Sequence, residues 1–514
     1  MKKCSLTRIT ALLLTVILIF SLVSCSSSKT AGSSDMNNAG GYYGSANNAA
    51  SSDSDLSGES YTEIIENSFI NTSDQASNYF SIDANTASYP NLRSMINQEY
   101  ANIPADAVRV EEMLNYFNYD YKTPTDGSVL ELTSSVFDTP YNDETKLLTI
   151  GLAATEVEFK ETQNNLVFLI DTSGSMYSDD KLPLVQQAFM LLTENLNPTD
   201  RVSIVTYAGS DKVALAGAYG YEKQKIMAVI EDLSAGGSTA GTKGIKTAYS
   251  LASEYFIEGG NNRVILATDG DFNVGIVTTA GLERFISEQK NSGIYFSVFG
   301  FGRGNIQSDK METLALKGNG TYSYIDSPKE ARRALVQEMG GSMITVAKDV
   351  KAGITFNPEY VESYRLIGYE NKLLSEEEFN DSNTDAGEIG SGHTVTVVYE
   401  IVMTDKALAE NGKIADVIIK YKPTENVGGN SDAELEKVMT IGAEAYHATP
   451  TANDIFVASV IEFALIIRDS EYKANSDLNA LISRLMDLDL SSDEFKEEFR
   501  DIVIKYRSTK EKQN

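Results

Sequence analysis

The chain of 514 residues has few of the side chains on which much enzyme chemistry depends. It contains two cysteines, Cys4 and Cys25, and two histidines, His393 and His447. Only these two histidines could therefore take part in histidine-dependent catalysis. Because both cysteines lie near the N-terminus, we expect no disulfide bond in the folded part of the chain, whose stability must come from its core.

Positive charge is also scarce, with 43 Lys and Arg residues against 73 Asp and Glu and a net charge of −30. An acidic surface repels phosphate backbones, which argues against nucleic acid as a partner. It is also the ordinary composition of a well-solvated protein.

Common catalytic and nucleotide-binding motifs are missing as well. Neither G-x-x-x-x-G-K-[ST], G-x-S-x-G nor H-E-x-x-H occurs. The segment GFGRGN (300–305) lacks the G-x-G-x-x-G spacing, so we interpret it as a turn after a strand and expect no nucleotide site. Asp385, Glu388 and His393 lie close together in sequence and could serve proton transfer, but a turn entering a strand is the simpler interpretation.

The N-terminus is typical of an exported lipoprotein. Basic residues precede a mostly apolar run from Ile9 to Val23, as in a signal peptide of residues 1–24. Leu22-Val23-Ser24-Cys25 resembles a lipobox, which predicts lipidation of Cys25 and an extracytoplasmic protein anchored to the cell membrane. The alternatives to lipidation are an ordinary signal peptide with an incidental cysteine and an uncleaved membrane anchor. Residues 25–60 are rich in Ser, Gly and Asn and predict a disordered spacer.

The pattern then indicates a flanking domain over 61–160 with helices followed by strands. A helix is expected from Pro104, with Val110, Leu114 and Phe117 on one face, and strands at Leu130–Val136 and Lys146–Ala153. The aromatic cluster at 116–121 could form a binding face, but core packing is the better interpretation.

The central segment, 164–342, alternates apolar runs with amphipathic stretches. The apolar runs are Leu166–Ile170, Val202–Tyr207, Val264–Ala267 and Ile294–Phe299. This alternation predicts an α/β domain in which helices cover both faces of a parallel sheet. Ligands of such sheets bind beyond the carboxyl ends of the strands.

The pattern changes again near Thr345. Val397–Val402 and Ala415–Tyr421 read as strands of a β-sandwich over 345–425, followed by a loop and helical region over 426–514. Both flanks of the central domain carry strands. We therefore predict that the strands within 130–153 pair with those after 345, so that the central domain is an insertion in the sandwich.

Oxygen side chains follow the predicted strands of the central domain. Asp171, Ser173 and Ser175 lie in DTSGS, Thr239 lies in a glycine-rich loop, and Asp269 lies in TDG. Ligands that offer only oxygen suit Mg²⁺, with Mn²⁺ or Ca²⁺ as alternatives.

Each of these pieces has an ordinary explanation when it is taken alone. Ser173 and Ser175 could cap the helix near Pro183, and TDG is a common turn. Acids in the neighbouring loops, namely Asp179, Asp180 and Asp271, are interpreted as solvated side chains rather than extra ligands.

The ordered set D-x-S-x-S, loop Thr and T-D-G resembles the von Willebrand factor type A domain. The resemblance maps its metal-ion-dependent adhesion site onto Asp171, Ser173, Ser175, Thr239 and Asp269. It implies a Rossmann-like fold and a non-enzymatic role in which the metal binds an Asp or Glu carboxylate of a protein partner. The flanking segments resemble those of a bacterial lipoprotein family with this domain at its centre. A metal-dependent hydrolase and a structural envelope protein with a vestigial metal site are the alternative functions.

Overall fold

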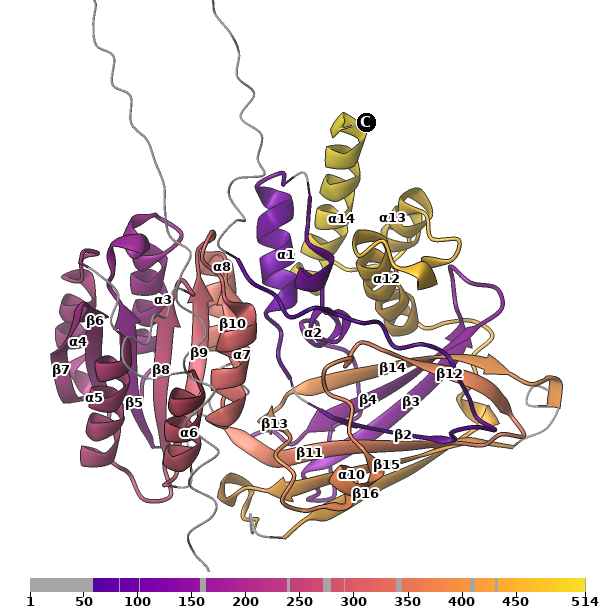
Figure 1. Ribbon diagram of the computed structural model, residues 1–514, viewed down its shortest axis with the longest axis horizontal. Coiled ribbons are helices and arrows are strands. Elements are labelled where there is room, and N and C mark those ends of the chain that lie inside the picture. The colour runs from indigo at the N-terminus through magenta and orange to yellow at the C-terminus, as the bar shows by residue number, and fades with distance from the viewer. Residues whose placement is uncertain are drawn as a thin grey trace, which may run out of the picture. The chain divides into compact units, whose positions relative to one another are not determined.

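The computed structural model describes residues 59–513, except 83, 101, 158–162, 238–240, 271–278, 291, 339–343, 407–411 and 430–432 (Figure 1). Two predicted functional residues, Cys25 and Thr239, lie outside the described residues. Within the described part of the chain, no helix combines the length and the apolar character needed to cross a bilayer.

The central domain contains a six-stranded sheet of order β10-β9-β8-β5-β6-β7. All neighbouring strands are parallel except the edge strand β7, which forms an antiparallel hairpin with β6. This hairpin was not expected from the sequence. The strands are β5 (Asn164–Asp171), β6 (Arg201–Ala208), β7 (Ser210–Tyr219), β8 (Asn261–Thr268), β9 (Ile294–Phe301) and β10 (Tyr322–Ile325).

Helices cover both faces of this sheet, as predicted. Leu166, Phe168 and Ile170 of β5 are buried on the face covered by α3, α4 and α8. Val167 and Leu169 are buried on the opposite face, against α5, α6 and α7. Successive side chains of β5 point to opposite faces of the sheet, and helices cover both faces. The whole strand therefore reads as one apolar run. The helices are α3 (Leu182–Glu194), α4 (Lys223–Glu231), α5 (Gly241–Glu254), α6 (Thr279–Lys290), α7 (Ser308–Lys317) and α8 (Pro328–Arg332), which continues as the π-helical turn η6 (Arg333–Gln337).

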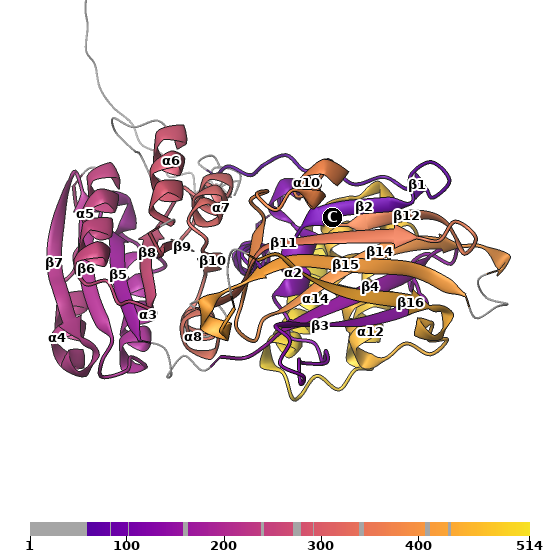
Figure 2. The same ribbon diagram turned by 90° about the horizontal axis from the view of Figure 1, so that it is seen from below.

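Two further sheets form the sandwich, one of order β1-β12-β14-β4-β3 and one containing β13-β11-β15-β16 with β2 beside β11 (Figure 2). Strand β4 pairs with β14 along its length, which confirms that strands before and after the central domain belong to one sheet. The strands are β1 (Ile70–Asn71), β2 (Ser77–Ser81), β3 (Leu130–Asp138), β4 (Lys146–Ala154), β11 (Thr345–Phe356), β12 (Val361–Ile367), β13 (Gly387–Gly390), β14 (Thr394–Met403), β15 (Lys413–Pro423) and β16 (Leu435–Gly442), with the short helix α10 (Glu376–Asn380) before β13.

One face of the β14–β4 sheet packs on the second sheet, through residues such as Val397 and Leu148. Its other face, through Val398 and Leu147, packs against helices that precede and follow the central domain in the sequence. The helices are α1 (Ser88–Asn97), α2 (Val110–Asn115), α12 (Ala452–Ile467), α13 (Leu478–Met486) and α14 (Glu494–Gln513). The first described helices and the C-terminal helices therefore share one core (Figure 1).

The helix predicted from Pro104 is shorter than expected. Ala105–Ala107 form a 3₁₀ turn, Val108 and Arg109 are extended, and α2 begins only at Val110. The aromatic residues that follow pack in the core, with Tyr116 and Phe117 almost fully buried.

Candidate metal-binding site

The two predicted acidic ligands lie at the carboxyl edge of the central sheet. Asp171 is the last residue of β5, and Asp269 follows the end of β8. These strands are parallel neighbours with Ile170 opposite Ala267, so both carboxylates lie at the same edge. The chain runs from β5 to β6 on one side and later returns to β8 on the other, which makes this edge the switch point where α/β sheets bind ligands.

The two serine hydroxyls lie in the loop that follows Asp171. The backbone N–H of Ser173 donates to Asp171 Oδ1 at 2.8 Å, and the Oγ atoms of Ser173 and Ser175 are 3.0 Å apart. Neither serine caps α3, whose N-cap is Lys181. Ser173 stands at the N-cap of the turn η4 (Gly174–Tyr177), but its side chain makes no capping hydrogen bond. The helix-cap explanation of these hydroxyls is therefore wrong.

Thr239 lies outside the described residues, but the loop that leads to it meets the serine loop. Gly236 donates its N–H to the carbonyl of Thr172 at 2.8 Å, and Gly174 donates to the carbonyl of Gly237 at 3.1 Å. The structure therefore joins the glycine-rich loop to the Asp171–Ser175 loop.

Asp171 is a buried carboxylate whose partners are hydrogen-bond donors. Its side chain has no exposed surface, and the Thr268 hydroxyl also donates to it, at 3.4 Å. Burial raises the pKa of Asp171 to about 6, with the Asp269 charge adding to the rise and hydrogen bonds from Ser173 and Tyr207 opposing it. No ion pair to Asp171 is present among the described residues, so a bound cation would relieve this burial of charge.

Asp269 has a different environment, which the sequence did not predict. Lys181 Nζ lies 2.8 Å from Asp269 Oδ2, and Asn305 Nδ2 donates to the same oxygen at 3.2 Å. The Lys181 side chain is 9% exposed and the Asp269 side chain is fully buried. The sequence signal was weak, since Lys181 is one lysine in the loop before Pro183.

The loop between β9 and α7, residues 302–307, supports Asp269 from one side. Gly270 has φ +99°, and a Cβ atom there would lie 2.3 Å from the Asn305 carbonyl oxygen, so the turn after Asp269 requires glycine. On its other side this loop binds Glu59, whose carboxylate accepts from Gly304 N–H at 3.0 Å and pairs with Arg303 at 2.8 Å. GFGRGN is thus a turn after a strand, as predicted, and its Gly304 N–H is bound by a protein carboxylate.

The residues at this edge fit an oxygen-loving divalent cation. Two carboxylates and two adjacent hydroxyls form a set of hard ligands with no nitrogen or sulfur. Among the described residues no group of three or more His, Cys, Asp or Glu could hold a metal, so a site here depends on hydroxyl ligands. Gly174 and Tyr177 beside the serines are exposed, Tyr177 by 83%, whereas Asp171, Ser173 and Asp269 are buried.

The remaining candidate residues lie apart from this arrangement or are engaged elsewhere. Asp180 accepts from Ser178, and Asp179 is exposed, while Asp271 is outside the described residues. Asp385 pairs with Lys317 at 3.2 Å, and His393 lies in the turn between β13 and β14.

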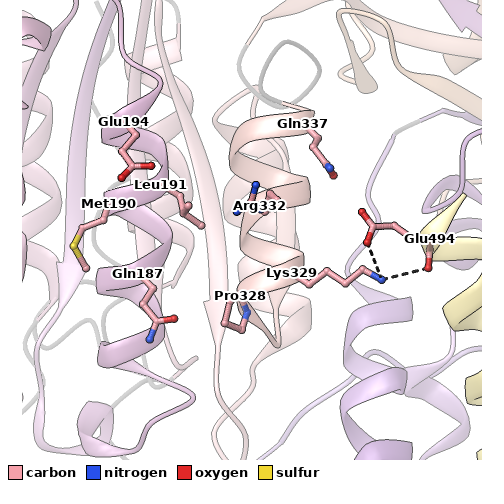
Figure 3. Close-up of a pocket in the computed structure, with 9 residues that line it drawn as sticks. All are labelled: Gln187, Met190, Leu191, Glu194, Pro328, Lys329, Arg332, Gln337 and Glu494. Atoms are coloured by element: carbon pink, nitrogen blue, oxygen red, sulfur yellow. Dashed lines mark hydrogen bonds and ion pairs between the residues drawn. The ribbon is translucent and has the colours of Figure 1, made fainter.

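A separate groove of about 480 Å³ lies between α3 and α8 (Figure 3). Met190, Leu191 and Pro328 supply apolar surface, and Lys329 extends toward Glu494, with which it pairs at 3.6 Å. The groove shares no lining residue with the cluster of Asp171, Ser173, Ser175 and Asp269, so it is not part of that site.

Comparison with known proteins agrees with this architecture. Residues 165–338 match the von Willebrand factor type A domain, residues 341–509 match the C-terminal region described as "Uncharacterized protein YfbK, C-terminal", and residues 55–149 match a family described as "von Willebrand factor". Uncharacterized protein YfbK of Escherichia coli (strain K12) is 40% identical over 420 residues, which are 77% of this chain and 72% of that protein. The chain belongs to the YfbK family. Within this family member the candidate site lies in the von Willebrand factor type A domain, and the match to the YfbK C-terminal region covers the later sandwich strands and the C-terminal helices.

More distant relatives share only parts of the chain. The human inter-alpha-trypsin inhibitor heavy chain H4 is 26% identical over 192 residues, 35% of this chain and 20% of that protein. Among solved structures, a von Willebrand factor type A protein from Catenulispora acidiphila is 17% identical, with a TM-score of 0.41, over 68% of this chain and 80% of that one.

Proposed function

We propose that this YfbK-family protein is a membrane-tethered, extracytoplasmic binding protein that holds an acidic group of a protein partner through a divalent cation. The von Willebrand factor type A domain indicates a role in protein interaction. The observation that carries the proposal is the meeting of Asp171, the two serine hydroxyls and Asp269 at the switch point of the central sheet. Anchoring through Cys25 would keep this edge outside the cytoplasm.

Asp171, Ser173, Ser175 and Asp269 would hold the cation, with Thr239 as a further ligand. Mg²⁺ is the favoured ion, and Mn²⁺ or Ca²⁺ would use the same oxygen ligands. When bound, the cation supplies a positive charge that attracts a carboxylate oxygen from outside. The hydroxyls add ligands without adding negative charge, and exposed Tyr177 adjoins them at the surface.

The test is a pulldown with the full chain in detergent. It compares the partner protein captured in Mg²⁺ with that captured in EDTA. We expect capture that depends on Mg²⁺ and is lost in Asp171→Asn, because this variant keeps the shape of the buried side chain and removes its charge. Asp126→Asn, in the exposed turn before β3, is the matched control and should bind as wild type does. Equal capture under all conditions would move the binding function to the flanking domains and leave the metal site vestigial.

Metal-dependent hydrolysis at the same edge is the alternative. Lys181 is a basic side chain beside the two carboxylates, and its ammonium is already paired with Asp269. The two carboxylates would be engaged by the cation, and among the described residues no third His, Cys, Asp or Glu joins them to act as a general base for water. Sustained turnover of phosphoesters or peptides that is lost in Asp171→Asn would favour the hydrolase over the binding protein.

A further inference from the structure

Lys181 is a buried cation at the candidate metal site. It follows the Asp171–Ser175 loop and immediately precedes α3. Its Nζ atom lies 2.8 Å from Asp269 Oδ2, and the two side chains are 9% and 0% exposed. A lysine ammonium is normally hydrated. When it is buried, its charge must be balanced by a protein carboxylate, and here that carboxylate is Asp269.

The structure makes room for the lysine stem. Gly302 has φ +68°, and a Cβ atom there would lie 2.3 Å from Lys181 Cγ and 2.6 Å from Cε. The Tyr324 hydroxyl donates to the Gly302 carbonyl at 2.9 Å and fixes this part of the loop. Lys181 therefore occupies a shaped passage between α3 and the β9–α7 loop, unlike a surface lysine that meets an acid by chance.

The ammonium and the Asn305 amide both bind Oδ2 of Asp269. A divalent cation that uses Asp269 as a ligand must approach a carboxylate that already has a positive partner. The Lys181 ammonium and a divalent cation that share this carboxylate would repel each other strongly where water is excluded. The charge of Lys181 thus stabilises the metal-free site and opposes metal binding.

We propose that Lys181 is an internal counter-cation of Asp269 that competes with the divalent cation and is displaced from Asp269 when the cation binds. This inference rests on the proposed metal site and adds a residue that sets the affinity of the site. Lys181 is a positioning residue in the metal-free protein, because it acts by holding Asp269.

The first test is calorimetric titration of the full chain with Mg²⁺, comparing wild type with Lys181→Met. Methionine retains most of the stem volume beside Gly302 and removes the charge. We expect Mg²⁺ to bind the variant at least about tenfold more tightly, and the melting temperature in EDTA to fall because Asp269 loses its cation. Lys225→Met, which removes an exposed lysine of α4, is the matched control and should change neither value.

A second test needs no substitution. Lys181 of the wild-type protein should be protected from acetic anhydride in EDTA and acetylated faster in Mg²⁺, as read by mass spectrometry. Equal Mg²⁺ affinity in wild type and Lys181→Met, or acetylation unchanged by Mg²⁺, overturns the role of Lys181 alone. Absence of Mg²⁺ binding to both proteins overturns the metal site itself and this inference with it.

Discussion

Replacing Arg93 by methionine tests how the central domain is joined to the rest of the fold. Arg93 lies on α1, and its side chain is 2% exposed. Its guanidinium pairs with Asp326 at 2.5 Å and with Glu330 at 2.8 Å, both next to or within α8, and with Glu498 of α14 at 2.6 Å. One side chain thus connects the first described helix, the end of the central domain and the last described helix.

The size of the effect follows from what each acid retains. Glu330 keeps its pair with Arg333 at 2.9 Å, and Glu498, 27% exposed, keeps Lys329 at 3.4 Å. Asp326 is 5% exposed and has no other cation among the described residues. Breaking a buried pair costs about 3–5 kcal/mol, so we expect Arg93→Met to lose about 3 kcal/mol, near the lower end.

Urea unfolding followed by circular dichroism measures this loss. Lys406→Met is the matched control, because its pair with Glu359 is 46% and 66% exposed and should contribute less than about 1 kcal/mol. Burial already raises the pKa of Asp326. The loss should therefore shrink as pH falls and Asp326 takes up a proton, and Asp326→Asn added to Arg93→Met should recover much of the stability. A loss below about 1 kcal/mol at pH 7, or no recovery in the double variant, would refute the reasoning.

Three further predictions concern buried ionisable side chains. Burial raises the pKa of Asp171 from 3.8 to about 6, so its charge destabilises the metal-free protein above pH 6, and this penalty disappears as pH falls from 6 to 3.8. Asp171→Asn should therefore stabilise the protein in EDTA at pH 7 by about 3 kcal/mol while abolishing stabilisation by Mg²⁺, and lower stability in EDTA would contradict this. Glu59→Gln should lose about 3 kcal/mol in urea unfolding, because it leaves Arg303 buried without its carboxylate, and a change within about 0.5 kcal/mol would count against that pair. Burial, with a smaller effect of Arg333, lowers the pKa of His393 from 6.5 to about 4, so wild type should lose up to about 3 kcal/mol as pH falls from 6.5 to 4. His393→Gln should remove this part of the pH dependence, whereas His447→Gln, at an exposed histidine, should not.

The sequence predicted the strands well where burial is continuous. The apolar runs of the central domain correspond to β5, β6, β8 and β9, because strands covered on both faces need apolar side chains at every position. It did not predict the edge hairpin of β6 and β7. Strand β7 is half exposed, so its pattern carries little hydrophobic signal.

Part of the candidate site was equally readable from the sequence. Asp171 ends the buried strand β5, Ser173 and Ser175 lie in the loop after it, and Asp269 follows β8. The carboxyl ends of parallel strands meet at one edge of a sheet. Local sequence therefore determined where these oxygen side chains lie. Metal binding by these four residues stays a prediction, as do the lipid site at Cys25 and the ligand role of Thr239, which lie outside the described residues.

Only the tertiary structure decided which charges meet. Lys181 and Asp269 are 88 positions apart, Arg303 and Glu59 are 244 apart, and Arg93 and Asp326 are 233 apart. No periodicity or motif links such residues, because a buried ion pair is selected by the geometry of packed elements and not by local backbone preference. The sequence by itself determined the buried strands of the central domain and the oxygen side chains at their ends, because both depend on local pattern. Only the packing of the β9–α7 loop beside the start of α3 placed a lysine against one of those carboxylates.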